Sequence, residues 1–249
     1  MLSFFFKKKS DWRNALSFIG TDIHNHLLPG IDDGSPDLEN SLELYEGLTE
    51  LGFSNFVFTP HILTDIHPNN RQTISEAYRH LAPEIIKRNP EVKLAFGAEY
   101  MVDFEFERIV AGGDLLTFGS ENYILIEMSY LVESPNLKNM IFELLTKGYQ
   151  PILAHPERYN FLHHKFSFYE ELVDAGCSLQ INLLSLLGHY GMGARKIAGK
   201  LIDQNLVHWV GTDTHHPGHI ESLRKLAEDK GVLKTLGKIK DLHNPKLAL

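Results

Sequence analysis

The chain has 249 residues, 43% of them hydrophobic, which is enough apolar material to bury a sizeable core and excludes long disorder. It carries 32 acidic residues against 24 lysines and arginines, and this balance argues against nucleic acid as a partner, because a phosphate backbone requires a basic surface. The single cysteine, Cys177, excludes an internal disulfide framework and fits a reducing cytoplasm, and no run reaches the ~20 apolar residues that stable membrane insertion requires.

The N-terminal segment reads MLSFFFKKKSDW, with three phenylalanines before three lysines. A signal peptide would place the charges first, ahead of a longer apolar stretch. We therefore interpret residues 1–17 as an N-terminal extension and residues 18–249 as one folded domain.

Short apolar runs then alternate with helical patterns along the chain. The runs that indicate buried strands are 18–24, 55–61, 93–100, 123–129, 150–157, 178–183 and 208–215. Helices are expected near 35–51, 73–88, 136–147, 167–175, 193–204 and 220–230, with a short helix and a turn between 100 and 120. Near-continuous apolar runs are typical of parallel strands covered by helices, and about seven such repeats predict one closed or nearly closed β/α barrel.

Local signals mark where several helices begin and end. Ser35 is a plausible N-cap with Pro36 at the first helical position, and Gly52 is a plausible stop for the same helix. Gly148, Gly176 and Gly231 follow three other predicted helices.

Metal-ligating residue types recur where the predicted strands end. In the first strand, Asp22, His24 and His26 share one face, because alternate strand residues point the same way. The full candidate set is His24, His26, Asp33, His61, Glu99, Glu127, His155, Asp213 and His215. Strand ends carry the chemistry of β/α barrels, and buried charges are paired or bind metals. We therefore expect two or three divalent ions; Mn, Fe and Zn all suit this set, and its oxygen-rich share favours Mn.

The motifs DIHNH, TPH, GAEY, AHPERY and TDTH resemble those of the polymerase and histidinol phosphatase (PHP) superfamily. The longer stretches DIHNHLLPGIDDGSPDLENSLEL and LLGHYG resemble its CpsB/CapC and YwqE branch, and the resemblance covers about residues 20 to 230. It implies a distorted (β/α)7 barrel with three metals. It also implies an enzyme that hydrolyses phosphotyrosine on a bacterial tyrosine kinase linked to polysaccharide synthesis or export.

The resemblance also assigns roles to individual residues. One metal would be held by His24, His26, Glu99 and Asp213, a second by Glu99, Glu127 and His155, and a third by Asp33, His61 and His215. Arg158 matches a family arginine that holds the phosphate, and acts with Asp213 and His215 in catalysis. Related proteins tend to carry another arginine soon after the last motif. Here the stretch after TDTH contains no arginine before Arg224, which leaves His216 or His219 as substitutes.

Several neighbouring residues receive a different interpretation. We expect Asp22 and Asp32 to support ligands rather than bind metal, and Tyr159 to pack in the interior. His189 and Tyr190 could line the rim of the pocket. Cys177 lacks the Cys-x5-Arg loop of thiol-dependent phosphatases, so we interpret it as a small buried residue.

Other functions remain compatible with the ligand set. A PHP enzyme could act on a small molecule such as histidinol phosphate, or be a nuclease. The closer similarity of the motif sequences to the CpsB/CapC and YwqE branch and the excess of acidic residues argue against both. A metal-bearing regulatory module without activity is a third alternative, and the complete ligand set argues against it. Bound metals lower the pKa of water toward ~7, so hydrolysis requires no covalent enzyme intermediate.

Overall fold

The computed structural model describes residues 11–249, which form a mixed α/β fold with parallel strands. The strands are β1 (Thr21–Asp22), β2 (Asn55–Phe58), β3 (His61–Ile62), β4 (Lys93–Phe96), β5 (Glu99–Met101), β6 (Tyr123–Glu127), β7 (Gln150–Ala154), β8 (Ser178–Asn182) and β9 (Trp209–Gly211). They pair in parallel in two sheets, with the orders β1-β2-β4 and β3-β5-β6-β7-β8-β9.

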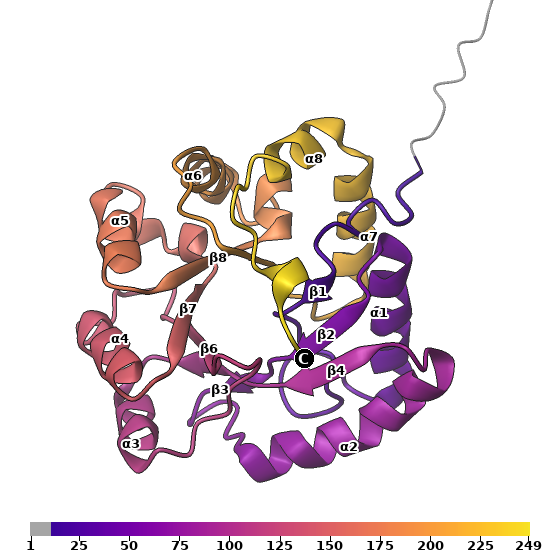
Figure 1. The fold of residues 1–249 in the computed structure, drawn as a ribbon, viewed down its shortest axis with the longest axis horizontal. Coiled ribbons are helices and arrows are strands. Elements are labelled where there is room, and N and C mark those ends of the chain that lie inside the picture. The colour runs from indigo at the N-terminus through magenta and orange to yellow at the C-terminus, as the bar shows by residue number, and fades with distance from the viewer. Residues whose placement is uncertain (1–10) are drawn as a thin grey trace, which may run out of the picture.

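Helices surround the strands, which lie toward the centre of the view in Figure 1. They are α1 (Leu38–Leu51), α2 (Arg71–Arg88), α3 (Phe104–Gly112), α4 (Leu137–Thr146), α5 (Ser167–Asp174), α6 (Met192–Asp203), α7 (Pro217–Glu228) and α8 (Lys230–Leu236). None of the helices within residues 11–249 combines the length and apolar character needed to span a bilayer.

Backbone hydrogen bonds connect segments beyond the formal strand ends. The Glu99 N–H donates to the Pro60 carbonyl at 3.0 Å, so the chain after β2 stays beside the chain after β4. The Asp213 N–H donates to the His24 carbonyl at 2.7 Å, and the His26 N–H donates to the Thr214 carbonyl at 3.0 Å. The segments that follow the first and last strands are therefore neighbours.

Apolar side chains pack on both sides of the strands. The larger core cluster includes buried residues of the helices, such as Leu48 and Leu223. A smaller cluster combines strand residues of both sheets with Ile23 and Phe118, which lie outside the strands. Its members are Ile23, Val57, Phe118, Leu125, Ile152, Ala154 and Trp209. Two apolar layers explain why these strands are almost continuously hydrophobic in sequence.

All seven predicted apolar runs contain strand, but two of them are divided. Pro60 separates β2 from β3, because proline has no N–H to continue a ladder. Gly97 and Ala98 likewise separate β4 from β5. Residues 1–10 of the predicted N-terminal extension lie outside the described residues. Leu16, in the described part, is buried and its N–H donates to the Leu51 carbonyl at 2.9 Å.

Two helix boundaries differ from the prediction. Asp37, not Ser35, is the N-cap of α1, and its side chain accepts from the Asn40 N–H. The Ser35 hydroxyl instead donates to the Asp37 carbonyl, which places Ser35 in the preceding turn. Gly231 does not end a helix but lies inside α8, which Asp229 caps. Gly52 does end α1, with a φ of 110°.

Candidate metal centre

Seven of the nine predicted ligands follow a strand or end one, and the other two begin a short strand. His24 and His26 follow β1, His155 follows β7, and Asp213 and His215 follow β9. The others lie at the start of β3 and β5, at the end of β6, and in the loop after β1: they are His61, Glu99, Glu127 and Asp33. A cavity of about 710 Å³ is lined by seven of the nine, and the remaining two, His24 and His26, are fully buried.

Glu99 lies among four histidine rings. Its Oε2 is 3.2 Å from His24 Nε2, 3.5 Å from His26 Nε2 and 3.1 Å from His61 Nδ1, while its Oε1 is 3.0 Å from His155 Nε2. The carboxylate is completely buried. A single side chain therefore contacts four histidines from three segments of the chain: the segment after β1, the start of β3 and the segment after β7.

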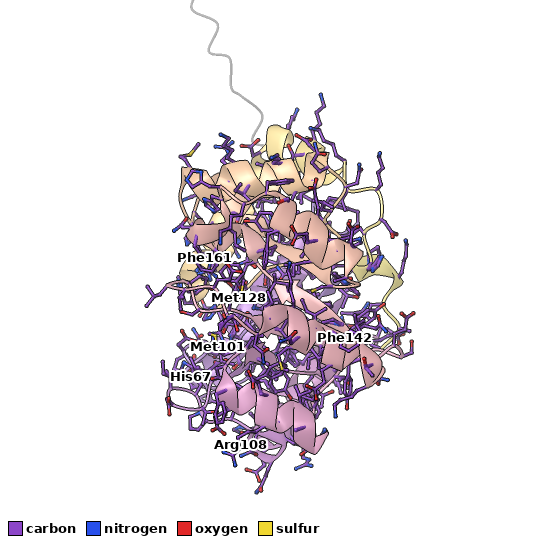
Figure 2. All side chains as sticks on the ribbon, turned by 90° about the vertical axis from the view of Figure 1, so that its left-hand side faces the viewer. His67, Met101, Arg108, Met128, Phe142 and Phe161 are labelled. Atoms are coloured by element: carbon purple, nitrogen blue, oxygen red, sulfur yellow. The ribbon has the colours of Figure 1, made fainter. Side chains whose placement is uncertain are left out.

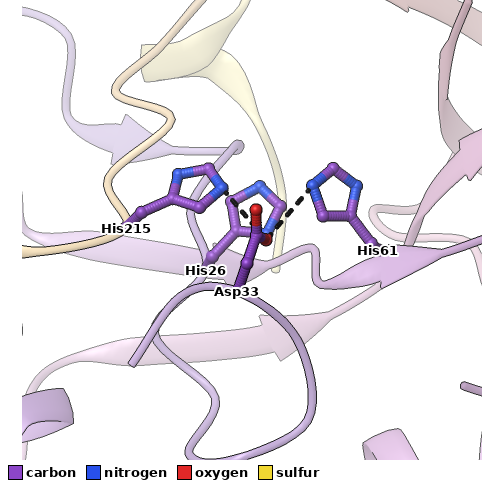
Figure 3. A group of neighbouring side chains, drawn as sticks. All are labelled: His26, Asp33, His61 and His215. Atoms are coloured by element: carbon purple, nitrogen blue, oxygen red, sulfur yellow. Dashed lines mark ion pairs between the residues drawn. The ribbon is translucent and has the colours of Figure 1, made fainter. Parts of the chain in front are cut away.

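Asp33 also contacts two histidines, and its side chain is more exposed than that of Glu99. Its Oδ1 is 3.6 Å from His61 Nε2 and 3.5 Å from His215 Nε2, as the dashed lines in Figure 3 show. The His26 ring lies between those two histidines in the same view and is stacked on His215 with 3.9 Å between ring centroids. These four side chains surround one small volume.

Ligand atoms within 4.8 Å of one another form four groups that could hold a metal. The groups are His26, Asp33, His61 and His215; His24, His26 and Asp213; His24, Glu99 and His155; and His61, Glu99 and Glu127. This grouping differs from the three-metal partition implied by the resemblance, since His26 joins the Asp33 group and His61 joins Glu99 and Glu127.

Hydrogen bonds orient three of the histidine rings. Nδ1 of His24 lies 2.8 Å from Gln180 Oε1, and Nδ1 of His26 lies 2.8 Å from Asp32 Oδ2. Nδ1 of His215 lies 2.9 Å from the Asp213 carbonyl. Such contacts fix the ring and leave Nε2 for a metal. Sequence reasoning missed Gln180, because a glutamine within an apolar strand carries no distinct signal.

Asp32 and Asp22 both have supporting positions. Asp32 accepts from the His61 N–H at 3.1 Å in addition to its contact with His26. Asp22 accepts from the Thr212 hydroxyl at 2.7 Å and from the Thr212 N–H at 3.1 Å, which ties β1 to the segment after β9. The first carboxylate orients a ring, and the second holds the backbone that carries the ligands.

The chemistry of this group fits divalent metal ions. Among the described residues, the buried atoms His61 Nδ1, Glu99 Oε2 and His155 Nδ1 make no directed hydrogen bond, although the first two lie 3.1 Å apart. Burial raises the pKa of Glu127, and the adjacent negative charge of Glu99 raises it further. Several carboxylates in one buried site require positive charge, and imidazole with carboxylate is a ligand set for Mn, Fe or Zn.

Two of these candidate ligands have unusual backbone conformations. His155 has a φ of 35° and Asp213 a φ of 51°, in the left-handed region that few residues other than glycine adopt. Residues held in such conformations cluster at functional sites, since surrounding contacts must stabilise them.

Arg158 extends into the same cavity from the short helical turn after β7. Its Nη1 lies 2.8 Å from Asp213 Oδ2. Its guanidinium carbon lies 4.4 Å from the centre of the Tyr130 ring and 4.0 Å from that of Tyr190. The Tyr130 hydroxyl lies 3.4 Å from His155 Nε2. Tyr190 therefore lines the cavity as anticipated, while Tyr130 was not predicted, although it follows the strand that ends in Glu127.

The two histidines considered as replacements for an arginine both line the cavity. His216 is exposed, whereas His219 is buried and its ring contacts the backbone of Asp213 and His215. Burial, followed by the charge on His216, lowers the pKa of His219 to about 4, so it is neutral near pH 7. Arg224 is not among the residues that line the cavity and pairs with Glu50 at 2.9 Å.

Other singled-out residues take interior or surface positions. Tyr159 is buried, and its hydroxyl donates to the Ala154 carbonyl at 3.1 Å and accepts from the Met128 N–H at 2.9 Å. His189, expected at the rim of the pocket, is not among the residues that line the cavity; it lies beside His219, with 5.3 Å between ring centroids. Cys177 is 1% exposed, and burial raises the pKa of its thiol to about 12.

Comparison with known proteins identifies the family of this chain. The sequence profile of a family described as "Capsular polysaccharide synthesis, CpsB/CapC" matches residues 20–230. The chain belongs to the CpsB/CapC family. It is 31% identical to the tyrosine-protein phosphatase YwqE of Bacillus subtilis over 195 residues, which cover 78% of this chain and 77% of YwqE. It is 32% identical to CapC of Staphylococcus aureus over 200 residues, covering 78% and 76% of the two chains.

Solved structures give the same relationship. A chain from the crystal structures of YwqE from Bacillus subtilis and CpsB from Streptococcus pneumoniae, described as metal-dependent tyrosine phosphatases, matches with a TM-score of 0.78 and 29% identity. The match covers 91% of this CpsB/CapC chain and 90% of the solved one. A histidinol phosphate phosphatase from Lactococcus lactis shares the fold, with a TM-score of 0.55 and 13% identity.

Proposed function

We propose that this protein is a metal-dependent protein tyrosine phosphatase, which hydrolyses phosphotyrosine on a protein substrate. The observation that carries the proposal is one cavity that combines the candidate ligands with a guanidinium, Arg158. The relatives YwqE and CpsB are tyrosine-protein phosphatases, which supports the same activity. By analogy with these relatives, the substrate would be a bacterial tyrosine kinase in the cytoplasm that is linked to polysaccharide synthesis or export.

The proposed architecture is a distorted (β/α)7 barrel. The hydrogen bonds between the segments after β1 and β9 support closure of the strands. The small core cluster, with members from β2, β6, β7 and β9, is consistent with a filled barrel interior. The ligands would then lie at the carboxyl ends of the strands, where barrel enzymes place their active sites.

The proposed cofactors are three divalent metals, with manganese first and iron or zinc as alternatives. All nine candidate ligands would take part, and Glu99, whose two carboxylate oxygens face different histidines, would serve more than one ion. When bound, such ions neutralise phosphate oxygens and lower the pKa of water toward ~7.

The chain's own residues bind and orient the phosphate. Arg158 presents a planar fork of N–H donors that suits phosphate oxygens, and the rings of Tyr130 and Tyr190 hold that plane. Asp213 and His215 act beside it as ligands. His216, exposed at the cavity where an arginine is missing, is proposed as a second contact to the substrate. Cys177 has no part in this scheme, because its thiol is buried and protonated.

A turnover experiment tests this function. Protein treated with chelator and then supplied with Mn, Fe or Zn is assayed with p-nitrophenyl phosphate, a phosphotyrosine peptide, a phosphoserine peptide and histidinol phosphate. We expect turnover of the first two substrates only, abolished by chelator and best restored by Mn. Elemental analysis should find two or three ions per chain. Faster hydrolysis of histidinol phosphate, or phosphotyrosine turnover without metal, would contradict the proposal.

A further inference from the structure

One side of the metal cavity is apolar. Leu63 and Ile66 lie in the loop after β3, Met101 ends β5, and Tyr130 and Leu131 follow β6; all five line the cavity. We refer to these five residues as the apolar rim. Ile66 is 67% exposed and Leu131 is 92% exposed. Aliphatic side chains this exposed at the edge of a polar pocket are typical of a surface that binds an apolar group.

Metal and phosphate binding do not explain the apolar rim. Both require oxygen and nitrogen donors, and the aliphatic members offer none. The same cavity already holds the candidate ligands and Arg158 on its other walls. The rim is therefore continuous with the site but has a different chemistry, suited to another part of the substrate.

The backbone holds the exposed Ile66 in place. The Leu63 N–H donates to the His67 carbonyl at 3.1 Å, and the His67 N–H donates back to Leu63 at 2.7 Å. The Ile66 N–H also donates to the Leu63 carbonyl, at 3.0 Å. At the loop's end, the Asn69 side-chain amide donates to the Ile31 carbonyl at 2.7 Å and the His61 carbonyl at 3.0 Å. A rigid loop that presents an apolar side chain loses little entropy when a ligand packs on it.

The opposite part of the rim is also anchored. Tyr130 packs on the Arg158 guanidinium, and its hydroxyl contacts His155. The Leu131 N–H donates to the Ser129 hydroxyl oxygen at 3.2 Å. Leu131 therefore projects from a segment that is tied to the metal centre through the residue before it.

We propose that the apolar rim binds apolar side chains that flank phosphotyrosine in the protein substrate. The inference rests on the proposed function, which places the phosphate at Arg158 and the ligands. The phenol ring then extends out of the cavity past Tyr130 and Met101. Residues next to the phosphotyrosine reach Ile66 and Leu131, so the site selects substrates by the apolar character of those residues.

The protein offers a matched control on another face. Phe142 in α4 is 73% exposed and is not among the cavity-lining residues. In Figure 2, Met101 and His67 lie toward one side of the molecule and Phe142 toward the other. A change at Phe142 therefore removes an exposed apolar side chain without altering the rim.

The test compares two phosphotyrosine peptides that differ only next to the phosphotyrosine, with leucine or serine on both sides. The metal-loaded enzyme should give a kcat/KM about tenfold higher for the leucine peptide, equivalent to ~1.4 kcal/mol. The double variant Ile66→Ser with Leu131→Ser should reduce this ratio to about twofold or less. The single variant Phe142→Ser should keep the wild-type ratio. Metal content and circular dichroism verify that each variant is folded and loaded.

Three results would overturn the inference. Equal kcat/KM for the two peptides in the wild type is one, and an unchanged ratio in the double variant is another. The third is a double variant that sediments as a smaller species while the ratio persists, because the rim would then be an interface between two copies of the chain. If p-nitrophenyl phosphate is hydrolysed, these results contradict only the rim; if it is not, the proposed function itself fails.

Discussion

Arg158 and Asp213, which follow β7 and β9, form a charge-assisted hydrogen bond of 2.8 Å between Nη1 and Oδ2. The other carboxylate oxygen, Oδ1, lies 3.4 Å from Nε2 of both His24 and His26. One side chain therefore connects the guanidinium to the candidate metal ligands. Asn182 also donates to Oδ2, at 2.6 Å, so the position of Asp213 does not depend on Arg158 alone.

This arrangement predicts how Arg158 variants behave. Arg158→Ala should lower kcat/KM for a phosphotyrosine peptide about 10- to 100-fold, because a hydrogen bond to a charged group contributes about 1.5–3 kcal/mol. Metal content should stay at the wild-type value, since Asn182 still holds Asp213. Arg158→Lys should recover only part of the loss, because lysine lacks the planar fork. Unchanged kinetics in Arg158→Ala would mean that the arginine serves only to pair with Asp213.

Glu99 is the ligand whose loss should matter most. Its two oxygens face His24, His26, His61 and His155, so Glu99→Ala removes a shared ligand from the centre of the group. Elemental analysis should find at least one ion fewer per chain. Turnover should fall below a tenth of the wild-type value, which corresponds to ~1.4 kcal/mol of barrier. The surface variant Glu91→Ala, at an exposed position, is the matched control and should change neither quantity.

Much of this site could be anticipated because strand ends and ligand types are local in sequence. Apolar runs set the strand positions, and the histidines and carboxylates follow them directly. The grouping of ligands could not be predicted, since it depends on which ring nitrogen faces which neighbour. His61, for example, places Nε2 toward Asp33 and Nδ1 toward Glu99.

Three other differences between the prediction and the structure have separate physical causes. Ser35 and Asp37 are both good helix caps, and the chain uses Asp37 because Ser35 bonds within the preceding turn. The left-handed backbone at His155 could not be predicted from the sequence, because this conformation is expected of glycine and not of histidine. Tyr130 could be found only after the fold had brought it over Arg158.

Gln180 should control metal affinity without binding metal. Its Oε1 lies 2.8 Å from His24 Nδ1 and directs the opposite ring nitrogen into the site. Gln180→Leu removes that acceptor with little change in volume, and loss of such a partner typically weakens metal binding 10- to 100-fold. Titration against a competing chelator measures the change. Gln204→Leu makes the same substitution at the exposed end of α6 and should bind metal as the wild type does; equal affinities in the two variants would remove Gln180 from this role.

His208 should make stability depend on pH. Burial, and then the charge of nearby His243, lower the pKa of His208 below its ordinary value of 6.5. The unfolded chain therefore takes up a proton that the folded chain resists, so stability is lost as pH falls below 6.5. In His208→Gln, the free energy of unfolding should fall less between pH 7.5 and pH 5.5 than in the wild type. Denaturant unfolding at both pH values measures this difference, and identical falls in the two proteins would contradict the assignment.

Cys177 separates a metal-dependent mechanism from a thiol-dependent one. Catalytic cysteines act as thiolates, whereas burial raises the pKa of this thiol to about 12 and leaves it 1% exposed. Iodoacetamide should therefore modify Cys177 slowly in the native protein and rapidly after unfolding in denaturant. Cys177→Ser and Cys177→Ala should both retain nearly full turnover of p-nitrophenyl phosphate with Mn, although Cys177→Ser loses some stability because it buries a hydroxyl. A Cys177→Ala variant that folds and holds its metals but is inactive would show that the thiol takes part in the reaction after all.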